Sequence, residues 1–306
     1  MASTVPSLPP LDIKRAPEGG EIGPIQTGWR LALREFSRNR LAVIGLGILA
    51  FFVLFSFVGP FFYHANVLST NLTAANSPPG AGHPLGTDNE GIDVLGELMR
   101  GGQASLEIGF LSAVIGIVLG AAWGAIAGLI GGIFDSTLMR IVDILLSIPF
   151  LFVVLIVAVR YGATVLSLSL IIGLFTWLVP ARLVRGEVLT LRTRDFIAAA
   201  RTAGARRSRL INRHLIPNSL SVIIVNVTFN FADAILAVAY LGFLGFGLHY
   251  PNYDWGDLLS NGTTYMLDGY WWLIYPVGLC IVLTVMACNL VGDALRDALD
   301  VRLRRR

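Results

Sequence analysis

Few residues of this 306-residue chain have the types and spacing that enzyme chemistry requires. The four histidines, His64, His83, His214 and His249, are scattered, and no two of them have the spacing of metal ligands. The only lysine is Lys14, and no glycine-rich phosphate-binding pattern precedes it, so ATP hydrolysis by a Walker-type loop is excluded. No GxSxG or HExxH pattern occurs. We therefore expect no catalytic residue, no metal site and no cofactor bound by this chain.

A polar stripe lies within an apolar stretch. Asn226, Asn230 and Asp233 are spaced four and three residues apart between about Leu220 and Leu244, so they share one helix face. A charged acid in the middle of a membrane span costs on the order of 2.5 kcal/mol or more, so Asp233 should face water, a partner or a pathway. Two interpretations stay open. The stripe lines the path of a transported solute, or the amides bond neighbouring helices while Asp233 pairs with an arginine or stays protonated.

The segment from Arg185 to Asn218 is too polar to span a membrane and too regular for a random loop. Asp195 is expected to cap a helix whose first turn includes Phe196 and Ile197, and the three alanines that follow favour helix. Gly204 should break that helix, because glycine reaches the left-handed conformation at little cost. A second helix over Ser208–Leu215, closed by Pro217, completes a predicted helical hairpin over residues 195–218. The alternative is a basic loop held near anionic lipid headgroups.

The elements that hold these residues are apolar. Hydrophobic residues make up 55% of the chain and charged residues 14%, whereas soluble proteins have roughly 25% charged residues. Spans need about 20 apolar residues, and lipid forces their backbone to form helices. The sequence therefore predicts an all-α membrane protein with six transmembrane helices, which begin near Leu41, Ser105, Leu138, Ala163, Leu220 and Trp271.

Basic residues are unevenly distributed between the spans. Arginines gather before the first span, between the fourth and fifth spans and after the sixth, whereas residues 62–103 and 247–270 hold Arg100 as their only cation. Short basic loops stay in the cytoplasm. Both termini and the hairpin are therefore predicted to be cytoplasmic, which requires an even number of spans.

These patterns divide the chain into segments. Residues 1–28 are predicted to be a mobile cytoplasmic N-terminus, and residues 29–62 an interfacial helix followed by the first span. Residues 63–104 form a predicted periplasmic or extracellular loop, residues 105–300 the transmembrane core, and residues 301–306 a basic C-terminal tail.

Two features of the core concern helix packing. Glycines recur at every fourth position in the second span, at Gly116, Gly120, Gly124 and Gly128. They form one stripe on which another backbone can approach closely. Pro149 and Pro180 interrupt the third and fourth spans and predict kinks there.

The outer loop is expected to be ordered between His83 and Leu95. Thr87 and Asp88 can turn the chain through side-chain-to-backbone hydrogen bonds, and Gly91 permits a second bend. A solvated acidic loop is the alternative.

The predicted hairpin resembles the EAA loop of ABC importer permeases. That pattern is acid-Ala-Ala, three residues, glycine, and a hydrophobic-hydrophobic-proline close. Here it reads Ala198-Ala199-Ala200, Gly204 and Leu215-Ile216-Pro217, with Ala198 in place of the acid. The strings Phe196–Ala205 and Arg213–Asn218 are similar to the dipeptide/oligopeptide/nickel branch.

Further stretches narrow the resemblance to the second, or "C", permease of that branch. The run His83–Asp88, with Gly91, Asp93, Val94 and Leu95, resembles its HPLGTDxxGRDVL signature, although Ile92 replaces the family's arginine. The other matching stretches are Ser105-Leu106 with Gly109, Leu244–Gly247, Trp255-Gly256 and Asn289–Asp300. The resemblance covers roughly residues 29 to 303.

The resemblance implies a type I ABC importer permease fold in a bacterial inner membrane. Its implied partners are a second homologous permease in a heterodimer, two ATP-binding subunits that hold ATP and Mg, and an extracytoplasmic solute-binding protein. The implied function is the import of di- or oligopeptides, with nickel or glutathione as alternative cargoes. A secondary transporter or an inert membrane scaffold is a more distant alternative, and no nucleic acid is involved.

The resemblance also assigns roles to residues. Coupling to the ATPase is expected from Ala198, Ala199, Ala200, Arg201, Gly204, Ala205 and Pro217. Thr87, Asp88, Gly91 and Asp93 are expected to give the outer loop its structure. If the polar stripe lines the path, Asn226, Asn230 and Asp233 would meet the backbone or amino group of a passing peptide.

Overall fold

The structure is a computed structural model that describes the backbone of residues 28–248 and 251–304 and the side chains of residues 33–248 and 251–299. The predicted all-α class is confirmed, since the described residues form helices, with two isolated β-bridges and no strand. The predicted mobile N-terminus lies outside the described residues except for Gly28, and so do residues 305–306 of the predicted basic tail.

The helices follow one another from the N-terminal to the C-terminal end. They are α1 (Gly28–Arg38), α2 (Arg40–Phe57), α3 (Gly59–Phe62), α4 (Val94–Ile130), α5 (Gly132–Ser147), α6 (Phe150–Tyr161), α7 (Val165–Thr176), α8 (Leu178–Leu191), α9 (Asp195–Thr202), α10 (Arg207–Leu210), a π-helical turn (Ile211–Leu215), α11 (Ile216–Asn218), α12 (Leu220–Phe243), α13 (Trp255–Thr264) and α14 (Tyr275–Arg304). Short 3-10 turns lie at Leu72–Ala74, Met266–Asp268 and Trp271–Leu273.

Four stretches of the described chain are each long and apolar enough to span a membrane: α2, α4, α12 and Trp271–Leu299, which includes most of α14. Two bent pairs, α5–α6 with a 78° bend and α7–α8 with a 41° bend, bring the number to six if each pair is one span. Both predicted kinks are present. Pro149 is the N-cap of α6, and α7 ends just before Trp177, three residues ahead of Pro180.

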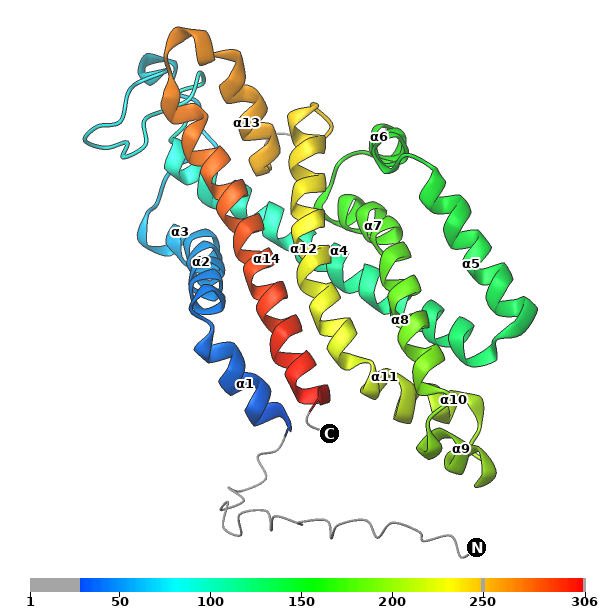
Figure 1. Cartoon of the computed structure of the whole chain (residues 1–306). Coiled ribbons are helices and arrows are strands. Elements are labelled where there is room, and N and C mark those ends of the chain that lie inside the picture. The colour runs from blue at the N-terminus through cyan, green and yellow to red at the C-terminus, as the bar shows by residue number, and fades with distance from the viewer. Residues whose placement is uncertain (1–27, 249–250, 305–306) are drawn as a thin grey trace, which may run out of the picture.

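The long helix α4 packs against α7, α8 and α12. Figure 1 shows the hairpin helices α9 and α10 near the end of the molecule where α1 begins and α14 ends. The outer loop, α13 and α6 lie at the opposite end. The arginine-rich segments with described backbone thus gather at one end, as the charge pattern requires.

The glycine stripe of α4 is confirmed as a packing surface, and the backbone that approaches it belongs to α8 and the residue before it. A Cβ atom added at Gly120 would lie 2.7 Å from the Trp177 carbonyl oxygen, and one added at Gly124 would lie 2.3 Å from the Ala181 carbonyl oxygen. Both distances are too short for carbon, so only glycine permits this approach.

The start of the second span differs from the prediction. Helix α4 begins at Val94 rather than at Ser105, so residues 94–104 of the predicted outer loop are helical. The physical reason is that Asp93 caps the helix at its N-terminal end and that the residues of its first turns are buried. The Asp93 carboxylate accepts a hydrogen bond from the Gly96 N–H at 2.9 Å, and Leu98 is 2% exposed.

Candidate functional site

A cavity of about 580 Å³ lies between α8, α12 and the ends of α7 and α14. Asn226, Asn230 and Asp233 all line it, which confirms that the polar stripe shares one face of α12. Glu187 of α8 and Arg296 of α14 line the same cavity. The sequence alone did not indicate these two residues, because nothing in their spacing relates them to α12.

Of the two amides in the stripe, Asn230 bonds a neighbouring helix and Asn226 bonds its own helix. Asn230 is 6% exposed, and its Nδ2 donates to the Thr176 carbonyl oxygen at 3.4 Å. In a continuous helix the Thr176 carbonyl would accept from the N–H of the residue four positions later. That residue is Pro180, which has no N–H, so the carbonyl lacks its usual donor. Asn226 donates to the Val222 carbonyl oxygen of its own helix at 2.8 Å. Asn230 therefore bonds α12 to the break between α7 and α8, as the structural interpretation predicts, whereas the Asn226 bond stays within α12.

The carboxylates of the cavity are available to a ligand. Asp233 is exposed to the cavity, and Glu187 is half-buried. Neither makes a hydrogen bond or an ion pair with another residue in the described part of the chain, so Asp233 does not form the arginine pair that the structural interpretation allowed. The cavity thus combines amide groups with two carboxylates and one guanidinium, a set suited to polar or zwitterionic solutes.

The cytoplasmic hairpin predicted from the sequence has the expected glycine turn. Gly204 has a φ of +77°, and its N–H donates to the Arg201 carbonyl oxygen at 2.9 Å. The Ala205 N–H donates to the Ala200 carbonyl oxygen at 3.0 Å. These two bonds form a Schellman C-cap, which requires a left-handed residue at the position of Gly204.

Two details of the hairpin differ from the prediction. Asp195 is the first residue of α9 rather than its cap, and no side-chain cap bond is present. Its negative charge still suits the N-terminal end of the helix dipole. Pro217 does not close the second helix; it lies in the first turn of α11, where its missing N–H is tolerated, and the helical path continues to Asn218.

The hairpin has one buried and one exposed face. Ile197, Leu210 and Leu215 are at most 3% exposed and pack with α4 and α8. The coupling candidates lie mainly on the other face. Ala198, Ala199, Arg201, Gly204 and Pro217 are exposed, and Ala200 and Ala205 are half-buried.

The outer loop is folded around Thr87, which is fully buried. Its hydroxyl accepts from the Ser77 N–H at 2.9 Å and donates to the Ala74 carbonyl oxygen. The indole of Trp272 donates to the Thr87 carbonyl oxygen at 3.1 Å. This contact, between residues far apart in sequence, ties the loop to the start of the last span.

Asp88 and Gly91 make the second bend. The Asp88 carboxylate accepts from the backbone N–H groups of Glu90 at 2.9 Å and Ile92 at 2.7 Å. Burial raises the pKa of Asp88, and these backbone bonds oppose the rise. Gly91 has a φ of +76°, and a Cβ there would lie 1.9 Å from the Asn71 carbonyl oxygen. Ile92 is 1% exposed within an apolar cluster, so an apolar residue fits this position.

Asp93 connects the loop to α4. One carboxylate oxygen caps the helix, and the other lies 2.8 Å from both the Tyr63 hydroxyl and the His83 Nδ1. Burial, together with the hydrogen bond and charge of Asp93, raises the pKa of Tyr63 to about 12. All four predicted loop residues thus take part in one folded unit. In the described part of the chain, no group of three or more His, Cys, Asp or Glu residues is arranged to hold a metal ion.

The chain is similar to known transport proteins. Residues 116–305 match the family described as binding-protein-dependent transport system inner membrane component. The chain belongs to this family. Residues 27–79 of the permease also match the N-terminal transmembrane domain of oligopeptide transport permease C.

Several curated relatives cover most of the permease. The dipeptide transport system permease protein DppC of Bacillus subtilis is 38% identical over 274 residues, which are 90% of this chain and 86% of the relative. The oligopeptide transport system permease protein OppC of Escherichia coli is 39% identical over 278 residues, 90% of this chain and 92% of the relative.

A solved chain of the MetNI methionine ABC transporter, in inward-facing conformations, is 24% identical with a TM-score of 0.51. The match covers 66% of this chain and 96% of that chain, and it shows the fold. The protein is therefore a multi-pass permease subunit of an ABC importer, with the type I permease fold, rather than an enzyme. Such a subunit works with ATPase and substrate-binding partners.

Proposed function

We propose that this permease, paired with a second homologous permease, forms the path by which di- or oligopeptides cross a bacterial inner membrane. Two partner ATPases would hold ATP and Mg, and an extracytoplasmic solute-binding protein would deliver the peptide. The cavity on α12 is the main support, because the carboxylate of Asp233 and the amides beside it can bind an amino group and peptide bonds. The names of the dipeptide and oligopeptide relatives support the same cargo.

The proposed orientation places both termini and the hairpin in the cytoplasm. Its support is the gathering of α1, α9, α10 and the end of α14 at one end of the molecule, because basic segments stay on the cytoplasmic side. The exposed face of the hairpin would then dock on an ATPase. Its buried face, packed on α4 and α8, would transmit the movement of the ATPase to the spans.

Uptake by the assembled importer tests the cargo. With its ATPases and binding protein in proteoliposomes, the importer should accumulate a labelled di- or tripeptide only when ATP is present. Nickel and glutathione, offered in parallel, should not be accumulated. Accumulation of either one without peptide uptake would contradict the peptide assignment and keep the ABC permease assignment.

Cysteine accessibility tests the path. In a background without Cys280 and Cys288, single cysteines at positions 226, 230 and 233 should react with a water-soluble thiol reagent. Their reactivity should change between the nucleotide-free and ATP-trapped states, because alternating access opens the cavity to one side at a time. The matched control is Ala234→Cys, since Ala234 is 0% exposed on the same helix and should not react. Absence of labelling at all three positions in both states would leave the stripe with a purely structural role.

A further inference from the structure

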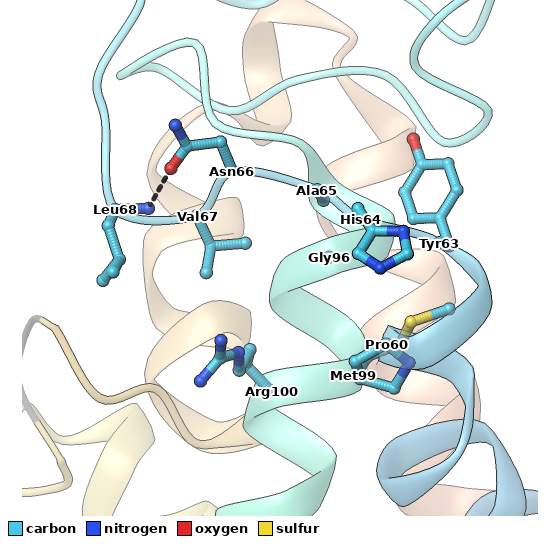
Figure 2. Close-up of a pocket in the computed structure, with 10 residues that line it drawn as sticks. All are labelled: Pro60, Tyr63, His64, Ala65, Asn66, Val67, Leu68, Gly96, Met99 and Arg100. Atoms are coloured by element: carbon cyan, nitrogen blue, oxygen red, sulfur yellow. Dashed lines mark hydrogen bonds between the residues drawn. The ribbon is translucent and has the colours of Figure 1, made fainter.

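A second cavity, of about 380 Å³, lies at the other end of the molecule, away from the α12 cavity. The outer end of α3, the segment that follows it and the first turns of α4 surround this outer pocket, as Figure 2 shows. Its polar lining residues include His64, Asn66 and Arg100. None of these three residues takes part in the peptide path or in the hairpin.

Arg100 gives the outer pocket an uncompensated positive charge. Its side chain is exposed, and it makes no hydrogen bond or ion pair with any described residue. Glu97, one turn earlier on α4, is 4% exposed and lines a different, small cavity with Asp88. Asp93 is already bound by Tyr63 and His83. No carboxylate of the described chain therefore neutralises Arg100.

The other polar side chains of the outer pocket do not converge on Arg100. His64 and Asn66 are both exposed, but in Figure 2 the Asn66 amide is turned toward the Leu68 N–H, from which its Oδ1 accepts a hydrogen bond at 3.2 Å, and the Arg100 side chain lies apart from both. The exposed guanidinium of Arg100 in this pocket suits an anionic oxygen group, above all a phosphate, which a guanidinium binds through two parallel bonds.

The position of the outer pocket indicates the source of that phosphate. Exposed apolar side chains recur at helical spacing along one face of α2, including Val43, Leu46, Leu54 and Phe57, which are 41 to 58% exposed. Phe61, on α3 beside the pocket residue Pro60, is 76% exposed. Such a face on a membrane span is covered by acyl chains, and aromatic side chains gather where the acyl chains meet the headgroups. An acyl chain along α2 would therefore place its headgroup at the outer pocket.

We infer that the outer pocket binds the phosphate of an outer-leaflet phospholipid, with Arg100 as the charged ligand and the exposed face of α2 and α3 as the acyl-chain surface. This site is independent of the peptide path. It ties the first span and the outer loop to the surrounding lipid on the side where the solute-binding protein arrives.

Native mass spectrometry of the assembled importer, titrated with phosphatidylglycerol in detergent, tests the site. Arg100→Gln should weaken binding of one lipid molecule roughly five-fold, the effect of removing one basic residue at a membrane surface. The matched control is Arg160→Gln, which removes the same charge from an exposed residue at the end of α6, outside the residues that line the outer pocket. That control should bind the lipid as the unmodified importer does.

Three outcomes would overturn the inference. One is equal lipid binding by Arg100→Gln and the unmodified importer. Another is displacement of the lipid by inorganic phosphate at millimolar concentration, which would indicate a site for a free anion without an acyl-chain surface. The third is weaker binding of the solute-binding protein by Arg100→Gln with lipid binding unchanged, which would make the outer pocket a protein contact.

Discussion

Gly124→Ala is expected to destabilise the permease by about 3 kcal/mol, the upper part of the usual range for overpacking. The added Cβ would lie 2.3 Å from the Ala181 carbonyl oxygen and 2.8 Å from the Arg185 backbone nitrogen. Both are backbone atoms of α8, so no side chain can rotate away. Helices α4 and α8 would have to separate, and the hairpin that continues from α8 would lose its support.

The measurement is the midpoint of thermal unfolding of the purified importer, together with the amount of permease in membranes. Gly47→Ala is the matched control, because it adds the same methyl group to a glycine of a spanning helix where no heavy atom lies within 4 Å. That control should leave both quantities unchanged or slightly raised, since alanine favours helix. Equal behaviour of the two variants would show that the close approach of α4 and α8 does not limit stability.

Gly204→Val is expected to separate ATP hydrolysis from transport while the chain still inserts. At a φ of +77° a β-branched residue costs about 1 kcal/mol or more, and no neighbouring atom lies within 4 Å, so the cost arises in the backbone alone. The hairpin would relax toward another turn. A free-energy cost of that size lowers the population of the hairpin geometry that docks on the ATPase by about five-fold or more. Peptide uptake should fall in proportion.

Uptake and the stimulation of ATPase turnover are measured together in proteoliposomes. Gly204→Asn is the matched control, because asparagine tolerates the left-handed conformation better than valine does, and it should retain most of the uptake. Normal uptake with normal ATPase stimulation in Gly204→Val would show that the hairpin is not the coupling element.

Local physics made several features predictable from the sequence. Apolar stretches specify spanning helices because lipid leaves the backbone no other partner. The two prolines predicted the kinks, and Gly204 predicted the turn, because each effect depends on the residue's own backbone. The glycine stripe of α4 predicted that another backbone comes close, since its spacing of four residues places the glycines on one side of the helix.

Other features depend on which elements face each other, and no spacing in the sequence encodes that. Sequence alone did not show that Asn230 donates to the Thr176 carbonyl that Pro180 leaves free. It also gave no sign of the ion pair between Arg185 of α8 and Asp135 of α5, with N–O distances of 2.6 and 2.7 Å.

The position at which α4 starts also depends on contacts between separate elements. Hydropathy marks the part of a helix that lies in lipid, but α4 extends beyond that part because the cap at Asp93 and the packing of Leu98 and Trp255 stabilise its first turns. The sequence by itself thus determined which stretches are apolar enough to span and which residues can turn, since these properties are local. Only the tertiary structure decided that Asp233 and Glu187 share a cavity and that Arg100 remains unpaired, because both depend on distances between separate helices.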